Sequence, residues 1–174
     1  MRAMRNTLLP VVVSFFLGVT FCQESSTRPT VRIVEATSRS QTCTTVFEDG
    51  FVRREVSLLP LTGQQSADFL VFEGTISKSD LEGIKRILTS GDALSLRSPR
   101  YPMQINQYGR MVAFGVSQGS KSFTKAFADP DGKQTIPKPI QEIDRFSRNI
   151  KNQKWPMLKG KVSPVCRMNM RNVW

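Results

Sequence analysis

Alternating apolar and polar positions predict a first β-hairpin near the start of the chain. β-Branched and aromatic residues occupy segments 44–48 and 51–56, on both sides of Asp49-Gly50. This pattern is typical of two paired strands with a short turn between them. The Asp-Gly pair favours a type I′ turn, in which both central residues have positive φ angles.

A second hairpin is predicted over 111–118 and 121–127, with its turn at Gly119-Ser120. A two-residue turn fixes the register of the strands, so residues of like character share a face. The apolar residues of one face are Val112, Phe114, Val116, Phe123 and Phe127, with Val116 opposite Phe123. Lys125 is the one charged residue on that face, and the opposite face consists of small residues.

Two further segments have apolar residues at helical spacing. They are Leu81, Ile84, Ile87 and Leu88 in the first segment, and Ile140, Ile143, Phe146 and Ile150 in the second. Ser77 is placed to cap the first helix at its N-terminus, and Gly91 is placed to close it. Pro137 and Pro139 precede the second helix, where proline is well tolerated.

These elements combine into an α+β fold. Additional short strands are predicted at 31–34 and 68–72. With the four strands of the hairpins they make six candidate segments, and we expect an antiparallel sheet of about five strands. The two helices need an apolar surface to cover, so we expect both to pack on one face of the sheet.

The first 22 residues have the pattern of a secretory signal peptide. Arg2 and Arg5 precede an apolar stretch over 8–19 that is shorter than the ~20 residues of a bilayer-spanning helix. We therefore expect cleavage after Cys22 and a secreted or periplasmic location. The expected division is a signal peptide (1–22), a leader with a first short strand (23–42), a single α+β domain (43–166) and a basic C-terminal tail (167–174).

An alternative processing route uses Cys22 itself. Residues 19–22, Val-Thr-Phe-Cys, resemble a bacterial lipoprotein box, in which the cysteine is lipidated. Phe21 stands where that pattern has Gly, Ala or Ser. A lipid on Cys22 would anchor the domain while leaving it folded outside the cytoplasm.

Export also determines how the other cysteines are interpreted. The chain has three cysteines, and in an oxidising compartment two of them should pair. With Cys22 removed or lipidated, Cys43 and Cys166 remain as partners. Their disulfide would close a loop of more than 100 residues, which the chain-entropy model values at about 5 kcal/mol.

The residue types present exclude several classes of chemistry. The chain has no histidine, which excludes Ser-His and Cys-His nucleophile pairs and the commonest transition-metal ligand. Residues 115–119 fit G-x-S-x-G and residues 122–125 fit S-x-x-K, but both lie in predicted strands, where neither motif has its catalytic geometry. There is no phosphate-binding glycine loop and no metal-spaced cysteine set, so we expect neither a cofactor nor a metal.

Charge is distributed unequally along the chain. The formal net charge is +11, and no acidic residue follows Asp144. The cations that form a candidate anion-binding stripe are Arg145, Arg148, Lys151, Lys154, Lys159 and Lys161. Such a stripe suits phosphates of lipid head groups or an anionic envelope polymer, with nucleic acid less favoured. The alternative is a solvated helix face followed by a solubilising tail.

No motif is specific enough to indicate a known family. Our leading hypothesis is an exported, non-catalytic binding or envelope-associated domain that contacts anionic surfaces through its basic C-terminal half. The alternatives are a secreted enzyme that works without histidine, for example on a polysaccharide, and a purely structural envelope protein.

Overall fold

The computed structural model describes residues 28–57, 69–97, 99, 106–118 and 121–160. Within this part of the chain, seven strands form one sheet and three helices are present. The strands are β1 (Pro29–Thr37), β2 (Gln41–Phe47), β3 (Phe51–Ser57), β4 (Phe69–Thr75), β5 (Arg110–Gln118), β6 (Lys121–Asp129) and β7 (Met157–Gly160). The helices are α1 (Lys78–Leu88), α2 (Gly91–Leu94) and α3 (Lys138–Asn152).

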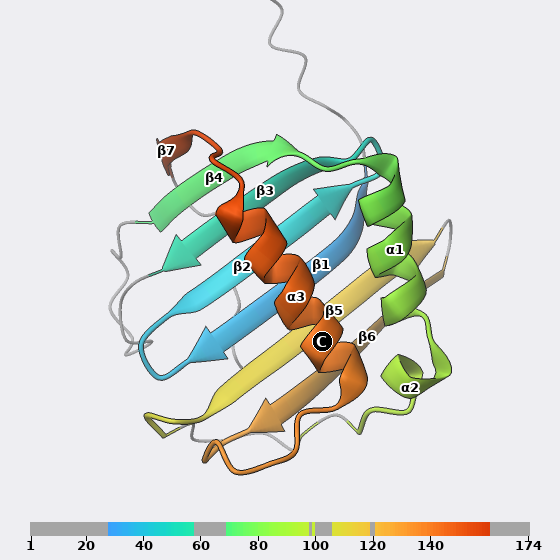
Figure 1. Ribbon diagram of the computed structural model, residues 1–174, viewed down its shortest axis with the longest axis vertical. Coiled ribbons are helices and arrows are strands. Elements are labelled where there is room, and N and C mark those ends of the chain that lie inside the picture. Colours follow the sequence, from blue (N-terminus) through green and yellow to red (C-terminus); the bar gives the residue numbers. More distant parts are fainter. Residues whose placement is uncertain (1–27, 58–68, 98, 100–105, 119–120, 161–174) are drawn as a thin grey trace, which may run out of the picture.

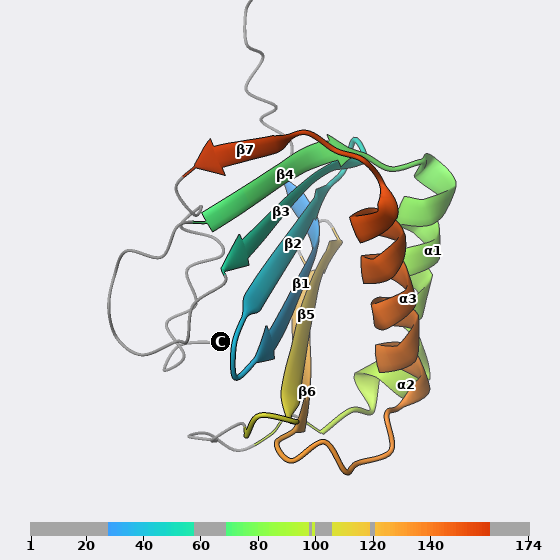
Figure 2. The same ribbon diagram turned by 60° about the vertical axis from the view of Figure 1, so that its left-hand side comes forward.

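The sheet is antiparallel, with the strand order β6-β5-β1-β2-β3-β4-β7. All three helices lie on the same face of the sheet, as the turned view shows (Figures 1 and 2). The α+β class is therefore confirmed. The expected counts of about five strands and two helices were too low. All six segments named as strands are present, and the elements not named are β7, which has only four residues, and α2, which is a single turn.

The strand β1 lies in the interior of the sheet, between β2 and β5. It begins at Pro29 and ends at Thr37, and so extends beyond the segment 31–34 in both directions. Residues on both of its faces are buried, including Ile33 and Val34. A strand buried on both faces lacks a clean alternation of apolar and polar residues, which is why its length was underestimated.

The first hairpin is confirmed, with Val46 paired to Val52, but its turn differs from the expected type I′. Gly50 has a φ of 86°, whereas no described residue other than glycine has a positive φ. The backbone N–H of Gly50 donates to Phe47 O at 3.1 Å, and Phe51 N–H donates to Asp49 Oδ1 at 2.9 Å. A type I′ turn would need positive φ at both central residues, but here Gly50 alone is left-handed. The Asp49 side chain stabilises the turn by accepting from the backbone N–H of Phe51.

The second hairpin is confirmed in its register, with Val116 opposite Phe123 and Val112 opposite Phe127. Its turn, 119–120, lies outside the described residues. Lys125 lies on the apolar face, as expected, and its Nζ donates to Leu96 O at 3.3 Å.

The helix α1 begins as its sequence predicts and ends earlier. Ser77 Oγ accepts from Asp80 N–H at 3.1 Å, and the Ser77 hydroxyl also donates to Asp80 Oδ2 at 2.6 Å. Thr89, rather than Gly91, caps the C-terminus of the helix. Gly91 instead opens α2, because the side chain of Ser90 accepts from Ala93 N–H and starts a new helical turn.

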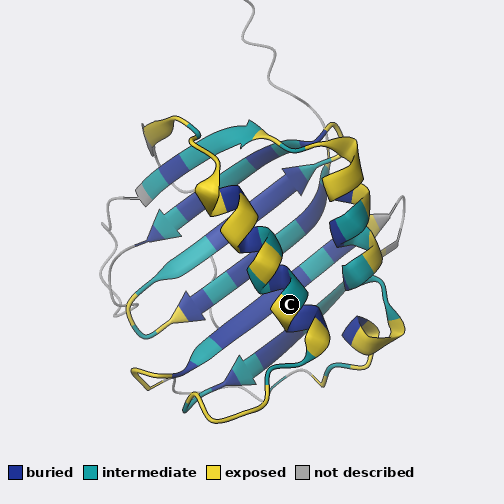
Figure 3. Ribbon diagram, in the orientation of Figure 1, coloured by how far each residue is buried: buried dark blue, intermediate teal, exposed yellow. Residues whose placement is uncertain are grey.

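The core lies between the sheet and the two longer helices. It includes Ile33 and Phe114 from the sheet, Ile84 from α1, and Ile140 and Ile143 from α3, all at most 2% exposed. Figure 3 shows the buried positions along the strands and the exposed positions on the outer side of α1 and α3. None of the helices in the described ranges is long and apolar enough to cross a membrane.

Candidate functional site

The helix α3 separates apolar and cationic side chains on opposite sides. Ile140, Ile143, Ser147 and Ile150 are buried against the rest of the domain. The outer side carries Arg145, Arg148, Lys151 and Lys154, the last of them just beyond the helix, and all four are exposed. We call these four residues the α3 basic face. The helical spacing of the four isoleucine and serine positions orients the cations outward.

The last acidic residue of the chain, Asp144, is turned away from this face. Its carboxylate accepts two hydrogen bonds from the Arg110 guanidinium of β5, at 2.7 and 3.0 Å. Such a bidentate pair is among the stronger charge-assisted contacts in proteins. It ties α3 to the sheet and leaves the outer side of α3 beyond Asp144 without any acidic residue.

A second carboxylate, Glu35 of β1, lies in the same layer between α3 and the sheet. Burial raises the pKa of Glu35, and the charge of Asp144 raises it further. The Ser147 hydroxyl and the guanidiniums of Arg110 and Arg54 act in the opposite direction. Burial also lowers the pKa of Arg54, whose guanidinium carbon lies 5.9 Å from the centre of the Phe72 ring. Through Asp144 and Ser147 this layer contacts the inner side of α3.

The cations of the α3 basic face differ in their ion pairs. Arg145 Nη1 lies 2.8 Å from Glu142 Oε2, one helical turn earlier. Among the ion pairs of the described residues, none involves Arg148, Lys151 or Lys154. Lys151 is in the last turn of α3, where a cation interacts favourably with the helix dipole. The C-terminal half of the face is thus available to an external anion.

The other residues predicted for this site fall at its margin or beyond it. Lys159 belongs to β7, and Lys161 lies outside the described residues. Cys43 lies in β2 with 2% exposure and is not a free thiol. Cys22 and Cys166 lie outside the described residues, so the Cys43–Cys166 disulfide and the lipidation of Cys22 stay predictions.

Two apolar residues beside the basic face were missed by the sequence analysis. Met157 is 57% exposed and Leu158 is 43% exposed, and they begin β7 just after Lys154. The apolar run 155–158 is visible in the sequence, but it was not among the segments predicted as strands. Because β7 pairs with β4 on one side and is the last strand of the sheet, these side chains stay at the rim.

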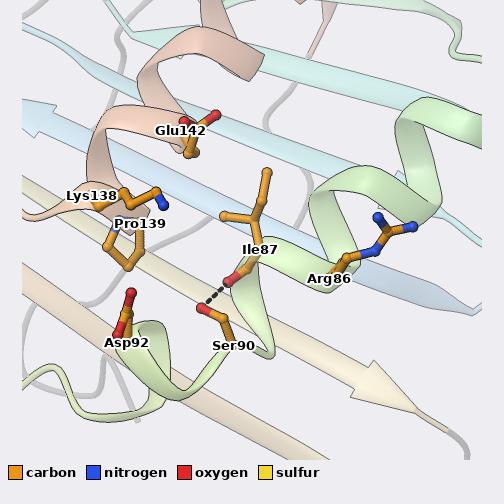
Figure 4. A pocket seen from close by; sticks show the side chains of 7 residues that line it. All are labelled: Arg86, Ile87, Ser90, Asp92, Lys138, Pro139 and Glu142. Carbon is orange, nitrogen blue, oxygen red and sulfur yellow. Dashed lines mark hydrogen bonds between the residues drawn. The ribbon is translucent and has the colours of Figure 1, made fainter.

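A small pocket lies between the helices and carries balanced charge. It has a volume of about 220 Å³, below the ~300 Å³ at which small-molecule sites usually begin. Figure 4 shows Ile87 in the middle of the group, with the charged residues around it. They are Arg86, Lys138, Asp92 and Glu142. Since Glu142 already pairs with Arg145, the pocket offers neither a cationic site nor an isolated pair of carboxylates.

The segments that fit G-x-S-x-G and S-x-x-K contain serines that lie in strands, as predicted. Ser117 lies in β5, which continues as a strand through Gln118. Ser122 and Lys125 lie in β6, three residues apart, and so point to opposite faces of the sheet. In the described part of the chain, neither serine has the backbone geometry that its motif requires. Among the described residues, no group of acidic or cysteine side chains is arranged to hold a metal ion.

The chain matches no protein-family model. It also has no significant match among curated proteins.

Proposed function

We propose that this chain is an exported, non-catalytic binding domain that contacts an anionic surface through the α3 basic face. Export rests on the signal pattern of residues 1–22, and binding rests on the arrangement of α3. The observation that carries the proposal is the exposure of Arg148, Lys151 and Lys154 without an ion pair among the described residues. Asp144, the nearest acid in sequence, is neutralised by Arg110 on the inner side.

The expected affinity follows from the number of available cations. Each Lys or Arg close to an anionic surface contributes about 1 kcal/mol at physiological salt. Three such cations therefore account for a change on the order of 100-fold in affinity. The attraction is screened by salt, since the Debye length falls to ~3 Å at 1 M ionic strength.

The test is a binding titration of the mature protein to heparin and to anionic vesicles at several salt concentrations. We expect affinity to fall steeply with salt, and a variant with R148Q, K151Q and K154Q to bind on the order of 100-fold more weakly. The matched control, R39Q with K78Q and K133Q, removes the same charge from exposed positions elsewhere. An affinity that does not fall with added salt, or an equal loss of affinity in both triple variants, would contradict a role specific to α3.

A further inference from the structure

We infer that the anionic partner of the α3 basic face is a lipid bilayer surface. This inference rests on the proposed function and names the partner of the same site. It is based on an α3–β7 ridge, defined as Arg148, Lys151, Lys154, Met157 and Leu158. All five residues are exposed, and they follow one another within eleven residues of chain, 148–158.

The apolar part of the ridge is unusual for this molecule. The exposed large hydrophobic side chains in the described ranges are Met157, Leu158, Leu94 and Tyr108. Met157 and Leu158 adjoin each other and follow Lys154 by three and four residues, whereas Leu94 lies in α2 and Tyr108 in the turn before β5. Figure 3 shows exposed positions continuing from the end of α3 into β7.

The ridge is fixed to the sheet by the residue between its two parts. The Trp155 ring lies directly against Gly74 of β4, where even a Cβ atom would overlap it. The backbone N–H of Trp155 also donates to the backbone carbonyl of Gln153 at 2.8 Å, which holds the turn after α3. Met157 pairs with Phe72 and Leu158 with Val71 of β4, so their side chains leave opposite faces of the last strand. The edge of the sheet thus has one exposed apolar side chain on each of its faces, and the backbone of both is held by β4.

This arrangement fits a bilayer better than a soluble polyanion. A polyanion offers charge for Arg148, Lys151 and Lys154 but nothing that removes Met157 and Leu158 from water. The surface of an anionic bilayer offers both, because head groups attract the cations and the acyl boundary accepts apolar side chains. Trp155 is partly buried against Gly74 and the core, so it reports on a nearby bilayer rather than anchoring in it.

The experiment compares vesicle and heparin binding of the mature protein in a W174F background, which leaves Trp155 as the single tryptophan. The vesicles contain phosphatidylcholine with or without phosphatidylglycerol, and far-UV circular dichroism checks that each variant is folded. The test variant is M157S with L158S, and the control is L94S, another exposed leucine remote in sequence. Quenching of Trp155 by brominated lipid gives an independent measure of contact depth.

We expect M157S/L158S to bind phosphatidylglycerol vesicles about 10-fold more weakly or worse, because two apolar side chains no longer leave water. Heparin binding should stay unchanged, L94S should bind as the parent does, and brominated lipid should quench Trp155. Unchanged vesicle binding in the double variant, or equal losses for vesicles and heparin, overturns the bilayer inference and leaves the proposed function standing. Absence of salt-sensitive binding to either probe overturns the proposed function as well.

Discussion

At the scale of single residues, two glycines show that the local backbone conformation determines whether an added Cβ atom lowers or raises the stability of the fold. Gly50 has a φ of 86°, and a Cβ there would lie 2.8 Å from Ile76 O. Gly83 lies within α1, and a Cβ there would meet nothing within 4 Å. The same substitution should therefore have opposite effects at the two positions.

We expect G50A to lower the free energy of unfolding by about 1–3 kcal/mol, because alanine is strained at positive φ and crowds Ile76. We expect G83A to raise it by roughly 0.5–1 kcal/mol, because glycine is a poor helix former. Urea unfolding followed by circular dichroism measures both. A G50A variant as stable as the parent would show that the β2–β3 turn has room to change its conformation.

The buried carboxyl of Glu35 makes stability depend on pH. Its pKa is raised by burial, so folding favours the neutral acid. The corresponding stabilisation is fully present below the ordinary value of 4.5 and is lost as pH rises through the folded-state pKa. E35Q keeps the neutral form at every pH, so it should melt at a higher temperature than the parent at pH 7.

The difference between E35Q and the parent should shrink as pH falls and disappear below pH 4.5, where Glu35 is neutral in both the folded and the unfolded chain. Thermal melts between pH 3 and pH 8 measure this. E48Q changes an exposed turn residue and serves as the control. A parent that is more stable than E35Q at pH 7 would mean that the charged Glu35 is held by Arg54 and Arg110 more strongly than burial opposes it.

At the scale of elements, the contact between Trp155 and Gly74 joins the end of α3 to the edge of the sheet. The added Cβ in G74A would overlap ring atoms of Trp155. Because the ring has to move, we expect a loss of about 1–3 kcal/mol and a more water-exposed Trp155. Trp155 fluorescence in a W174F background should shift to longer wavelength.

The matched control for G74A is G115A in β5. A Cβ on Gly115 would lie 3.5 Å from Phe123 O and from Thr124 Oγ1, which is an ordinary contact distance. G115A should therefore leave both stability and fluorescence close to those of the parent. Equal behaviour of the two variants would show that Trp155 does not need the space that Gly74 provides.

Elements with local periodicity could be predicted from the sequence. The two hairpins and the helices α1 and α3 have strong patterns of apolar residues or clear caps, such as Ser77. The strand β7 could not be predicted, because a four-residue edge strand is defined by its pairing with β4 rather than by its own residues. The full length of β1 was hidden for a related reason, since it is buried on both faces.

The candidate site was predictable in part. Its cations were visible in the sequence, because no acid follows Asp144. The pairing of Asp144 with Arg110 was not visible, since these residues are 34 positions apart and meet only through packing of α3 on β5. The exposure of Met157 and Leu158 was hidden too, because an apolar run in a sequence normally indicates burial.

At the scale of the whole molecule, the Cys43–Cys166 disulfide remains the prediction with the largest consequence for stability. Cys43 is buried in β2, the middle strand of the sheet, so a bond to Cys166 would fasten the C-terminal tail to the core. We expect C166S to lower the free energy of unfolding by up to about 5 kcal/mol, because the long closed loop restricts the unfolded chain. Urea unfolding with and without reductant measures this.

The control is C22S, which keeps a small residue at the expected cleavage site and should leave stability unchanged, because residue 22 departs with the signal peptide. Non-reducing peptide mass spectrometry of the exported protein should recover Cys43 and Cys166 in one linked species, and should place the new N-terminus at Gln23. Free thiols at both positions would contradict the pairing. A lipid on Cys22 would instead establish the lipoprotein route, and it would bring the α3–β7 ridge to a bilayer by a tether as well as by its own contacts.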